Sequence, residues 1–223
     1  MFPLKDSITY YGSIVGTRGM IGLCILVFFG QAALGAEGFL ASFSAWGFVP
    51  ALFFADPLRE SWRLVSSMFL HGSAFHLLSN VWFLWVFSPA VEGRTGFWKY
   101  LLVYLLSGTG AALLQGLADP SSTVPMVGAS GAISGVLGAY LVLFPKAVVL
   151  TLVPPFFLFW LPSVFFLGLW FFFQIWYGFS GLPGVAWWAH AGGFLIGMVL
   201  AILVRPKRNY KADPFWECWR DYC

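Results

Sequence analysis

The chain has 223 residues, of which 60% are hydrophobic and only 9% are charged, and its formal net charge at pH 7 is +3. A soluble domain carries about 25% charged residues, so this composition excludes a water-soluble globular protein and indicates an integral membrane protein. The sequence has no groove of interleaved basic and aromatic residues that would suggest binding to nucleic acid.

Six apolar runs have the length of a membrane-spanning helix, which needs about 20 residues. They lie at residues 19–36, 74–91, 98–118, 127–144, 158–178 and 186–204. A pair of prolines at 154–155 interrupts the chain after the fourth run, so we expect a loop at 145–157 before the fifth helix. The fold class predicted from these runs is an all-α membrane protein, a bundle of six transmembrane helices.

The longest connection between two predicted helices, at residues 37–73, is rich in Trp and Phe. Such a composition predicts a folded segment at the membrane interface rather than an open loop. The chain therefore divides into an N-terminal segment at 1–18, a six-helix domain at 19–205 and a C-terminal tail at 206–223.

The distribution of basic residues predicts the orientation of the bundle in the membrane. With the N-terminus inside, ten of the twelve Lys and Arg residues lie on the cytoplasmic side, and only Arg59 and Arg63 lie outside. The positive-inside rule then places both termini in the cytoplasm, and we expect a multi-pass protein of the bacterial inner membrane. The chain has no convincing internal repeat, which argues against a transporter built from inverted halves.

Polar residues within the predicted spans are the candidates for a functional site, because an ionisable group at membrane depth is costly. Counted from the basic residue that follows each helix, Ser130 and His190 lie about 24 and 22 Å from the cytoplasmic face. Counted from Glu92, His76 and Asn80 on the second helix lie roughly 24 and 18 Å from the same face. Four polar side chains from three helices therefore meet in one layer, and residues 121–125 must dip into the membrane to reach it.

Small residues repeat at intervals of about four along the fourth and sixth predicted helices. They are Gly131, Gly135 and Gly138 or Ala139 on the fourth helix and Ala189, Gly193, Gly197 and Ala201 on the sixth. Such stripes allow two helices to approach closely, which would bring the serine and the histidine within hydrogen-bonding distance. Taken alone, the stripes are equally typical of ordinary packing in membranes.

With these residues the chain resembles the rhomboid family of intramembrane serine proteases, from about residue 20 to 205. The matching motifs are Gly128-Ala129-Ser130-Gly131 for G-x-S-G, Ala189-His190-Ala191-Gly192-Gly193 for A-H-x-x-G, His76-Leu77-Leu78-Ser79-Asn80 for H-x-x-x-N, Trp62-Arg63 for W-R, and Glu92 to Gly96 for an acidic–glycine turn. The first four of these elements, in the right order, are far more specific than a single G-x-S-G.

The resemblance implies a serine endopeptidase that cleaves single-span membrane proteins in or near their transmembrane segments, without a cofactor or a metal. Ser130 would be the nucleophile and His190 the general base and acid. The backbone N–H of Ser130 and the side chains of His76 and Asn80 would hold the oxyanion. Since no Asp or Glu falls within a predicted span, we expect a Ser-His dyad rather than a triad.

The resemblance and the composition together suggest how a substrate would reach the site from the membrane. We expect lateral access past the fifth helix, whose aromatic cluster at 170–173 could pack loosely enough to swing outward. The loop at 179–184 would be a flexible cap over the site. Besides substrates, the partners we expect are membrane lipids.

One position departs from the family pattern. Many rhomboids have an aromatic residue one turn after the nucleophile, where it stacks on the catalytic histidine, but this chain has Ser134 there. Another side chain, such as a neighbouring Trp, must then orient His190. Ser134 is also a rival nucleophile, and its alternative role is a hydroxyl that bonds back to a helix carbonyl.

Other interpretations of the chain and of single residues remain open. The alternative function is a catalytically inactive rhomboid-like protein that binds or escorts membrane proteins, and it predicts a missing Ser or His. We expect His71 to be structural, and Trp62 and Arg63 to serve loop architecture or headgroup contact. A zinc site is not expected, because no acidic residue shares the layer of the histidines.

Overall fold

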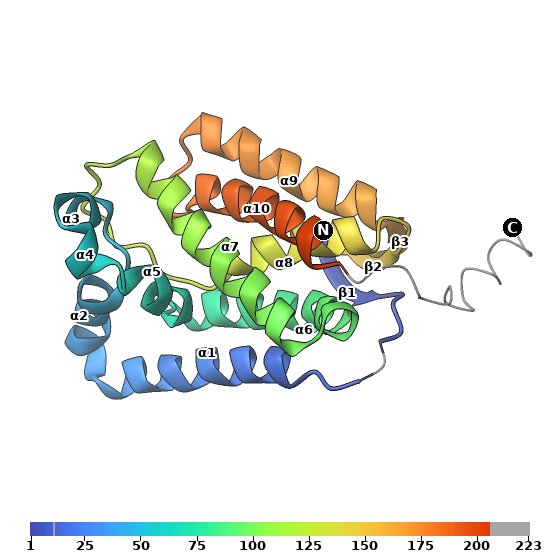
Figure 1. Ribbon diagram of the computed structural model, residues 1–223, viewed down its shortest axis with the longest axis horizontal. Coiled ribbons are helices and arrows are strands. Elements are labelled where there is room, and N and C mark those ends of the chain that lie inside the picture. The colour runs from blue at the N-terminus through green and yellow to red at the C-terminus, as the bar shows by residue number, and fades with distance from the viewer. Residues whose placement is uncertain (11, 206–223) are drawn as a thin grey trace, which may run out of the picture.

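The computed structural model describes residues 1–10 and 12–205, so the predicted tail at 206–223 lies outside the described residues. This part of the chain is mainly helical (Figure 1). In chain order its elements are β1 Phe2–Asp6, α1 Val15–Ala33, α2 Gly35–Trp46, α3 Pro50–Ala55, α4 Pro57–Glu60, α5 Arg63–Ser66, the 3-10 helix η1 Ser67–Phe69, α6 Ala74–Thr95, α7 Phe97–Ala118, α8 Ser130–Leu143, β2 Val148–Val153, β3 Phe157–Pro162, α9 Ser163–Ser180 and α10 Trp187–Val204.

Among the described residues, five helices are long and apolar enough to cross a membrane, namely α1, α6, α7, α9 and α10. Helix α8 has 14 residues, about 21 Å at 1.5 Å per residue, and is shorter than the ~30 Å hydrocarbon core. It begins at Ser130 rather than at 127, because Gly128 has a φ of 126°, which is incompatible with a right-handed helix. The backbone at 119–129 is irregular.

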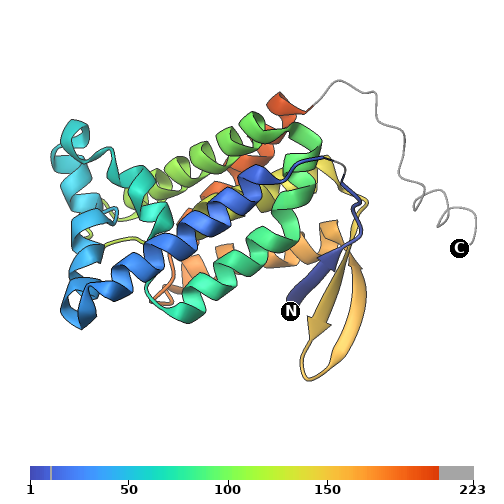
Figure 2. The same ribbon diagram turned by 90° about the horizontal axis from the view of Figure 1, so that it is seen from below.

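Helix α8 lies at the centre of the bundle. Every residue from Ala132 to Tyr140 is buried, which means that neighbours cover all its faces. Helices α6, α7 and α10 provide the main contacts and α9 provides a smaller one, and Figures 1 and 2 show α8 enclosed between these elements. The short helix is therefore screened by protein.

The small-residue stripes of α8 and α10 bring the two backbones into contact. A Cβ atom at Gly197 would collide with the carbonyl oxygen of Gly135, and one at Gly193 would collide with the carbonyl oxygen of Gly131. The close approach predicted from these stripes is confirmed, since only glycine fits at this separation.

Glu92 anchors α1 to α6. The span predicted to end at residue 91 continues to Thr95, so Glu92 lies inside the last turn of α6 and is buried. Its carboxylate accepts hydrogen bonds from the backbone N–H groups of Gly16 and Thr17, both at 2.7 Å, and from Thr17 Oγ1 at 2.8 Å. A carboxylate is favourable here because the first N–H groups of a helix lack intrahelical partners.

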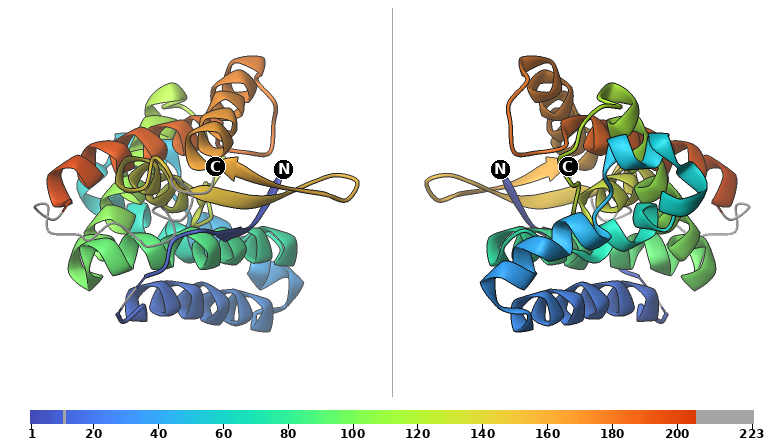
Figure 3. Two further views of the ribbon diagram at one scale, coloured as in Figure 1. Left: turned by 90° about the vertical axis from the view of Figure 1, so that its right-hand side faces the viewer. Right: turned by 90° about the vertical axis from the view of Figure 1, so that its left-hand side faces the viewer.

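A three-stranded antiparallel sheet, in the order β1-β2-β3, corrects the all-α prediction. The loop predicted at 145–157 is wrong, because most of this segment forms β2 and the turn of a hairpin, and α9 starts only at Ser163. Figure 3 shows the hairpin projecting sideways from the helices. A short apolar run fits a helix or a strand equally well, and β1 pairs from the far N-terminus, so local patterns could not reveal the sheet.

The last residue of β1 contacts the central helix. Asp6 is buried, and its Oδ2 accepts a hydrogen bond of 3.0 Å from the hydroxyl of Tyr140 on α8. Burial raises the pKa of the Asp6 carboxyl from 3.8 to about 7, and the hydrogen bond from Tyr140 offsets part of this rise. The strand thus ties the N-terminus to the helix that begins at Ser130.

The connection between α1 and α6 is folded, as predicted, and comprises α2 to η1. Arg63 Nη1 donates to the carbonyl oxygens of Ser44, at 2.7 Å, and Gly47, at 3.2 Å, while its guanidinium lies 4.9 Å from the ring centre of Trp62. These contacts join α5 to the end of α2, so the Trp-Arg pair serves loop architecture, one of its two expected roles.

The contact between α8 and α10 predicts that Gly197→Ala will destabilise the protein. The added methyl group meets a backbone carbonyl, which cannot move aside, and overpacking of this kind costs about 1–3 kcal/mol. Each kcal/mol lowers the Tm of a chain of this size by about 2–4 °C, which thermal unfolding in detergent would measure. The matched control is Gly22→Ala on α1, where a Cβ has no neighbour within 4 Å. An equal effect of the two substitutions would contradict the prediction.

The buried carboxyl predicts a pH-dependent effect of Asp6→Asn. Since the pKa of Asp6 is raised to about 7 on folding, the folded state binds the proton more tightly, and wild-type stability falls as the pH rises from about 4 to 7. The amide carries no such dependence. We expect the variant to match wild type near pH 4 and to have a Tm several degrees higher at pH 8. A constant difference in Tm across this range would argue against a raised pKa.

Candidate functional site

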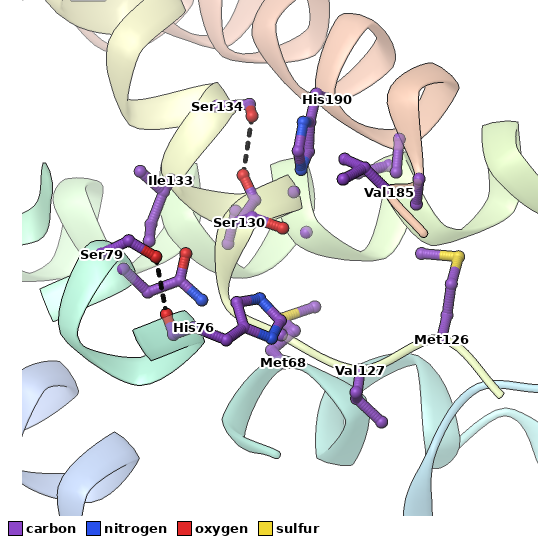
Figure 4. Close-up of a pocket in the computed structure, with 18 of the residues that line it drawn as sticks. Met68, His76, Ser79, Met126, Val127, Ser130, Ile133, Ser134, Val185 and His190 are labelled. Carbon is purple, nitrogen blue, oxygen red and sulfur yellow. Dashed lines mark hydrogen bonds between the residues drawn. The ribbon is translucent and has the colours of Figure 1, made fainter. Parts of the chain in front are cut away.

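A cavity of about 480 Å³ lies between α6, α8 and α10. All four side chains predicted to share one layer line it, namely Ser130, His190, His76 and Asn80. In Figure 4, His76 and His190 face the cavity from opposite sides of Ser130. The structure therefore brings together residues that are up to 114 positions apart in the sequence.

Ser130 is the first residue of α8 and is half-buried. Because the first N–H groups of a helix have no intrahelical acceptor, its backbone N–H is free to bind an oxyanion. No hydrogen bond joins Ser130 Oγ to His190 in the part of the chain that the structure describes. Hydrogen bonds between catalytic groups are often long in substrate-free structures and shorten when a substrate binds.

Ser134 lies one turn after Ser130 and is buried. Its hydroxyl donates a hydrogen bond of 2.6 Å to the carbonyl oxygen of Ser130, drawn as a dashed line in Figure 4. This is the structural role that the sequence left open for Ser134. A hydroxyl engaged in this way is a poorer nucleophile candidate than Ser130.

His190 lies in the first turn of α10, and Gln174 of α9 contacts its ring. Nδ1 of His190 lies 2.9 Å from Oε1 of Gln174, within hydrogen-bonding distance. The Trp170 ring is also near, with its centre 6.1 Å from that of His190 and a tilt of 30°. The expectation of a neighbouring Trp was therefore incomplete, because it missed Gln174. The signal was present in the sequence as the single amide of a strongly aromatic span.

His76 and Asn80 lie one turn apart on α6, beside the segment that leads into α8. A Cβ at Gly128 would lie 2.7 Å from Nε2 of His76 and 3.7 Å from Nδ2 of Asn80, so glycine allows the backbone to pass close to both. Nδ2 of Asn80 is buried and has no acceptor among the described residues. A buried donor without a partner is costly, and a bound oxyanion would supply the missing acceptor.

His71 lies outside the cavity, before α6. It is fully buried, its backbone N–H donates to Oε1 of Gln31 at 3.0 Å, and its Nδ1 lies 3.1 Å from the carbonyl oxygen of Phe69. Burial, and to a smaller extent the nearby His76, lowers the pKa of His71 to about 4. The ring is therefore neutral at physiological pH, which agrees with the structural role expected for it.

No group of three or more His, Cys, Asp or Glu side chains is placed to hold a metal ion within residues 1–10 and 12–205. The four predicted site residues bring a hydroxyl, two imidazoles and an amide to the cavity, beside backbone N–H groups. This set matches nucleophilic acyl transfer, which needs a nucleophile, a base and donors for an oxyanion.

Comparisons with known proteins identify the family. A family model described as the Rhomboid domain matches residues 58–207. RHOMBOID-like protein 4 of Arabidopsis thaliana is 35% identical over 160 residues, which cover 68% of this chain and 36% of that protein. RHOMBOID-like protein 2 of the same plant is 36% identical over 165 residues, covering 70% of this chain and 46% of that protein.

A bacterial relative carries the name of a protease. Rhomboid protease GlpG of Klebsiella pneumoniae is 32% identical over 123 residues, covering 55% of this chain and 41% of that protein. In each of these three cases, the match covers less than half of the relative. With five apolar helices of spanning length in the part of the chain that the structure describes, this chain is a multi-pass integral membrane protein, and the matched domain shows that it belongs to the rhomboid family.

Proposed function

We propose that this protein is an intramembrane serine endopeptidase that hydrolyses peptide bonds in or near the transmembrane segments of other membrane proteins. The observation that carries the proposal is the cavity lined by Ser130 and His190 together with His76 and Asn80. The similarity to a relative named as a rhomboid protease supports it.

In the proposed reaction, Ser130 Oγ attacks the carbonyl carbon of the peptide bond and its proton passes to Nε2 of His190. The carbonyl π electrons move onto the oxygen. When this tetrahedral intermediate collapses, the C–N bond breaks and the proton on His190 passes to the leaving amine. Water then attacks the acyl-enzyme and gives a proton to His190, and that proton returns to Ser130 Oγ as the acid product leaves.

The developing negative charge on the carbonyl oxygen needs donors that are already in place. In the proposal they are the backbone N–H of Ser130, the ring of His76 and the side-chain N–H of Asn80. The missing acceptor of Asn80 in the described structure supports this role. Each such donor contributes on the order of 3 kcal/mol to the stability of a transition state.

The proposal also includes the arrangement in the membrane. Helix α8 is an incomplete sixth span enclosed by α6, α7, α9 and α10, and the basic residues that follow α8 and α10, Lys146 and Arg205, mark the cytoplasmic side. Both termini then lie in the cytoplasm, and a bacterial inner membrane is the proposed location. The cavity opens near the opposite side, where water for hydrolysis is available.

Substrates are proposed to be single-span helices that reach the cavity past α9. This helix buries only Ser163, Phe166, Leu167 and Gln174, so most of its surface would face lipid. Gly184, Val185 and Ala186, which follow the end of α9, line the cavity and are suited to cap it. A peptide bond within a helix is shielded, so the substrate must unwind locally to reach Ser130.

Substitution of the dyad tests the proposed function directly. We expect Ser130→Ala and His190→Ala to lower kcat by about 10⁴-fold or more, because each removes a partner in proton transfer. The measurement is cleavage of a model single-span substrate in liposomes. Ser134→Ala is the matched control and should retain activity, since its hydroxyl bonds the helix carbonyl. Activity that survives in Ser130→Ala and disappears in Ser134→Ala would identify Ser134 as the nucleophile.

The oxyanion donors predict a second pattern. Asn80→Ala and His76→Ala should lower kcat by about 10²- to 10³-fold, while labelling of Ser130 by a fluorophosphonate should remain detectable. Leu78→Ala, on the exposed side of the same helix, is the control and should change neither readout. An increase in KM without a decrease in kcat would show that the two residues bind substrate but do not stabilise the transition state.

A further inference from the structure

The distal half of α9 buries one polar side chain, Gln174, and its other contacts with α10 are made by partly exposed aromatic rings. Between residues 168 and 180, Gln174 is the one buried residue, and the others are partly buried or exposed. Phe172, Phe173 and Trp176 are all more than one third exposed. In a membrane, such apolar residues gain little from leaving lipid. The hydrogen bonds of Gln174 are therefore the specific polar contacts that add to this aromatic packing and fix the position of this part of α9.

Both ends of the Gln174 amide are engaged. Its Nε2 donates a hydrogen bond of 3.0 Å to the carbonyl oxygen of Trp170, one turn earlier on α9. This bond directs Oε1 outward from α9, where it lies 2.9 Å from Nδ1 of His190. An amide oxygen can only accept a hydrogen bond. Nδ1 of His190 must therefore carry the hydrogen, and Nε2 is left as the basic nitrogen.

We propose that Gln174 is a positioning residue that fixes the Nδ1–H tautomer of His190 and makes catalytic alignment depend on the position of α9. The proposal deepens the proposed function and rests on it. Gln174 does not touch the reacting atoms. It acts through His190, with Nε2 held free toward the cavity, and it does so with a neutral amide in place of a carboxylate.

The same hydrogen bond links substrate access to catalysis. When α9 moves outward to admit a substrate, the bond between Gln174 and His190 breaks, and the amide and the imidazole each lose a partner in apolar surroundings. Unpaired polar groups in such surroundings are costly, so the bond favours the closed position of α9. His190 is thus aligned for proton transfer only after α9 has returned over the bound substrate.

The tautomer of His190 can be measured without any proteolysis. The chain has three histidines, so ¹⁵N-histidine NMR in detergent, with His71→Asn and His76→Asn used for assignment, resolves the ring of His190. With Ser130→Ala as the background, we expect the Nδ1–H form alone when Gln174 is present and a mixture of both tautomers in Gln174→Leu. An unchanged tautomer in Gln174→Leu overturns the proposal, whatever the outcome for the proposed function.

Two further variants distinguish positioning from a general loss of structure. Gln115→Leu is the matched control, because Oε1 of Gln115 accepts from the backbone N–H of Ala189 at 3.1 Å and does not bond the imidazole; the tautomer should not change. Gln174→Glu keeps an acceptor for Nδ1–H and should restore the single tautomer even if Gln174→Leu folds poorly. A mixture in Gln174→Glu or in Gln115→Leu would contradict a specific role of Gln174.

Steady-state kinetics with Ser130 intact test the link to α9. We expect Gln174→Leu to lower kcat by about 10- to 100-fold without raising KM, because the imidazole is misaligned while α9 opens more easily. Gln174→Glu should recover most of the loss. An unchanged kcat, or a raised KM alone, would overturn the coupling. Absence of cleavage by the wild-type protein would instead count against the proposed function and leave the NMR result standing.

Discussion

Contact between the backbones of α8 and α10 is the constraint on which the site depends. Gly131 faces Gly193 and Gly135 faces Gly197, so each step of four residues on one helix matches a step of four on the other. The two helices are therefore parallel and in register. The first turns of both helices, which carry Ser130 and His190, are set beside one another as a consequence. In lipid the hydrophobic effect does not drive two apolar helices together. Close packing at glycine therefore provides the stabilisation that burial of apolar surface provides in water.

The remaining helices pack around this pair and add residues to the cavity. Helix α6 brings His76 and Asn80 to the same cavity, and its other end holds α1 through the carboxylate of Glu92. That carboxylate lies at the end of α6 far from the cavity, so it cannot orient His190, and the neutral Gln174 contacts the imidazole instead. The carboxylate of Glu92 thus holds two helices together, and the side chain that contacts His190 is an amide.

Much of this arrangement could be predicted because its signals are local. Apolar runs predict the helices of spanning length, and small residues at four-residue intervals predict the α8–α10 contact. Counting residues along each helix predicts that four polar residues lie in one layer. The sheet could not be predicted, since β1 and β2 are about 140 residues apart and either would fit other structures. The contact of Gln174 depends on the rotation of α9 about its own axis, which no local pattern specifies.

The irregular segment before α8 binds the folded connection between α1 and α6. Phe48 and Met126 exchange backbone hydrogen bonds of 3.0 and 2.7 Å, and the N–H of Gly128 donates to the carbonyl oxygen of Ser67 at 2.9 Å. Non-helical backbone at membrane depth is stable only when protein satisfies its polar groups. In a random mutagenesis screen for loss of the proposed activity, substitutions around Phe48 should therefore appear alongside those around Ser130. Distance along the chain would hide that these two regions form a single structural unit.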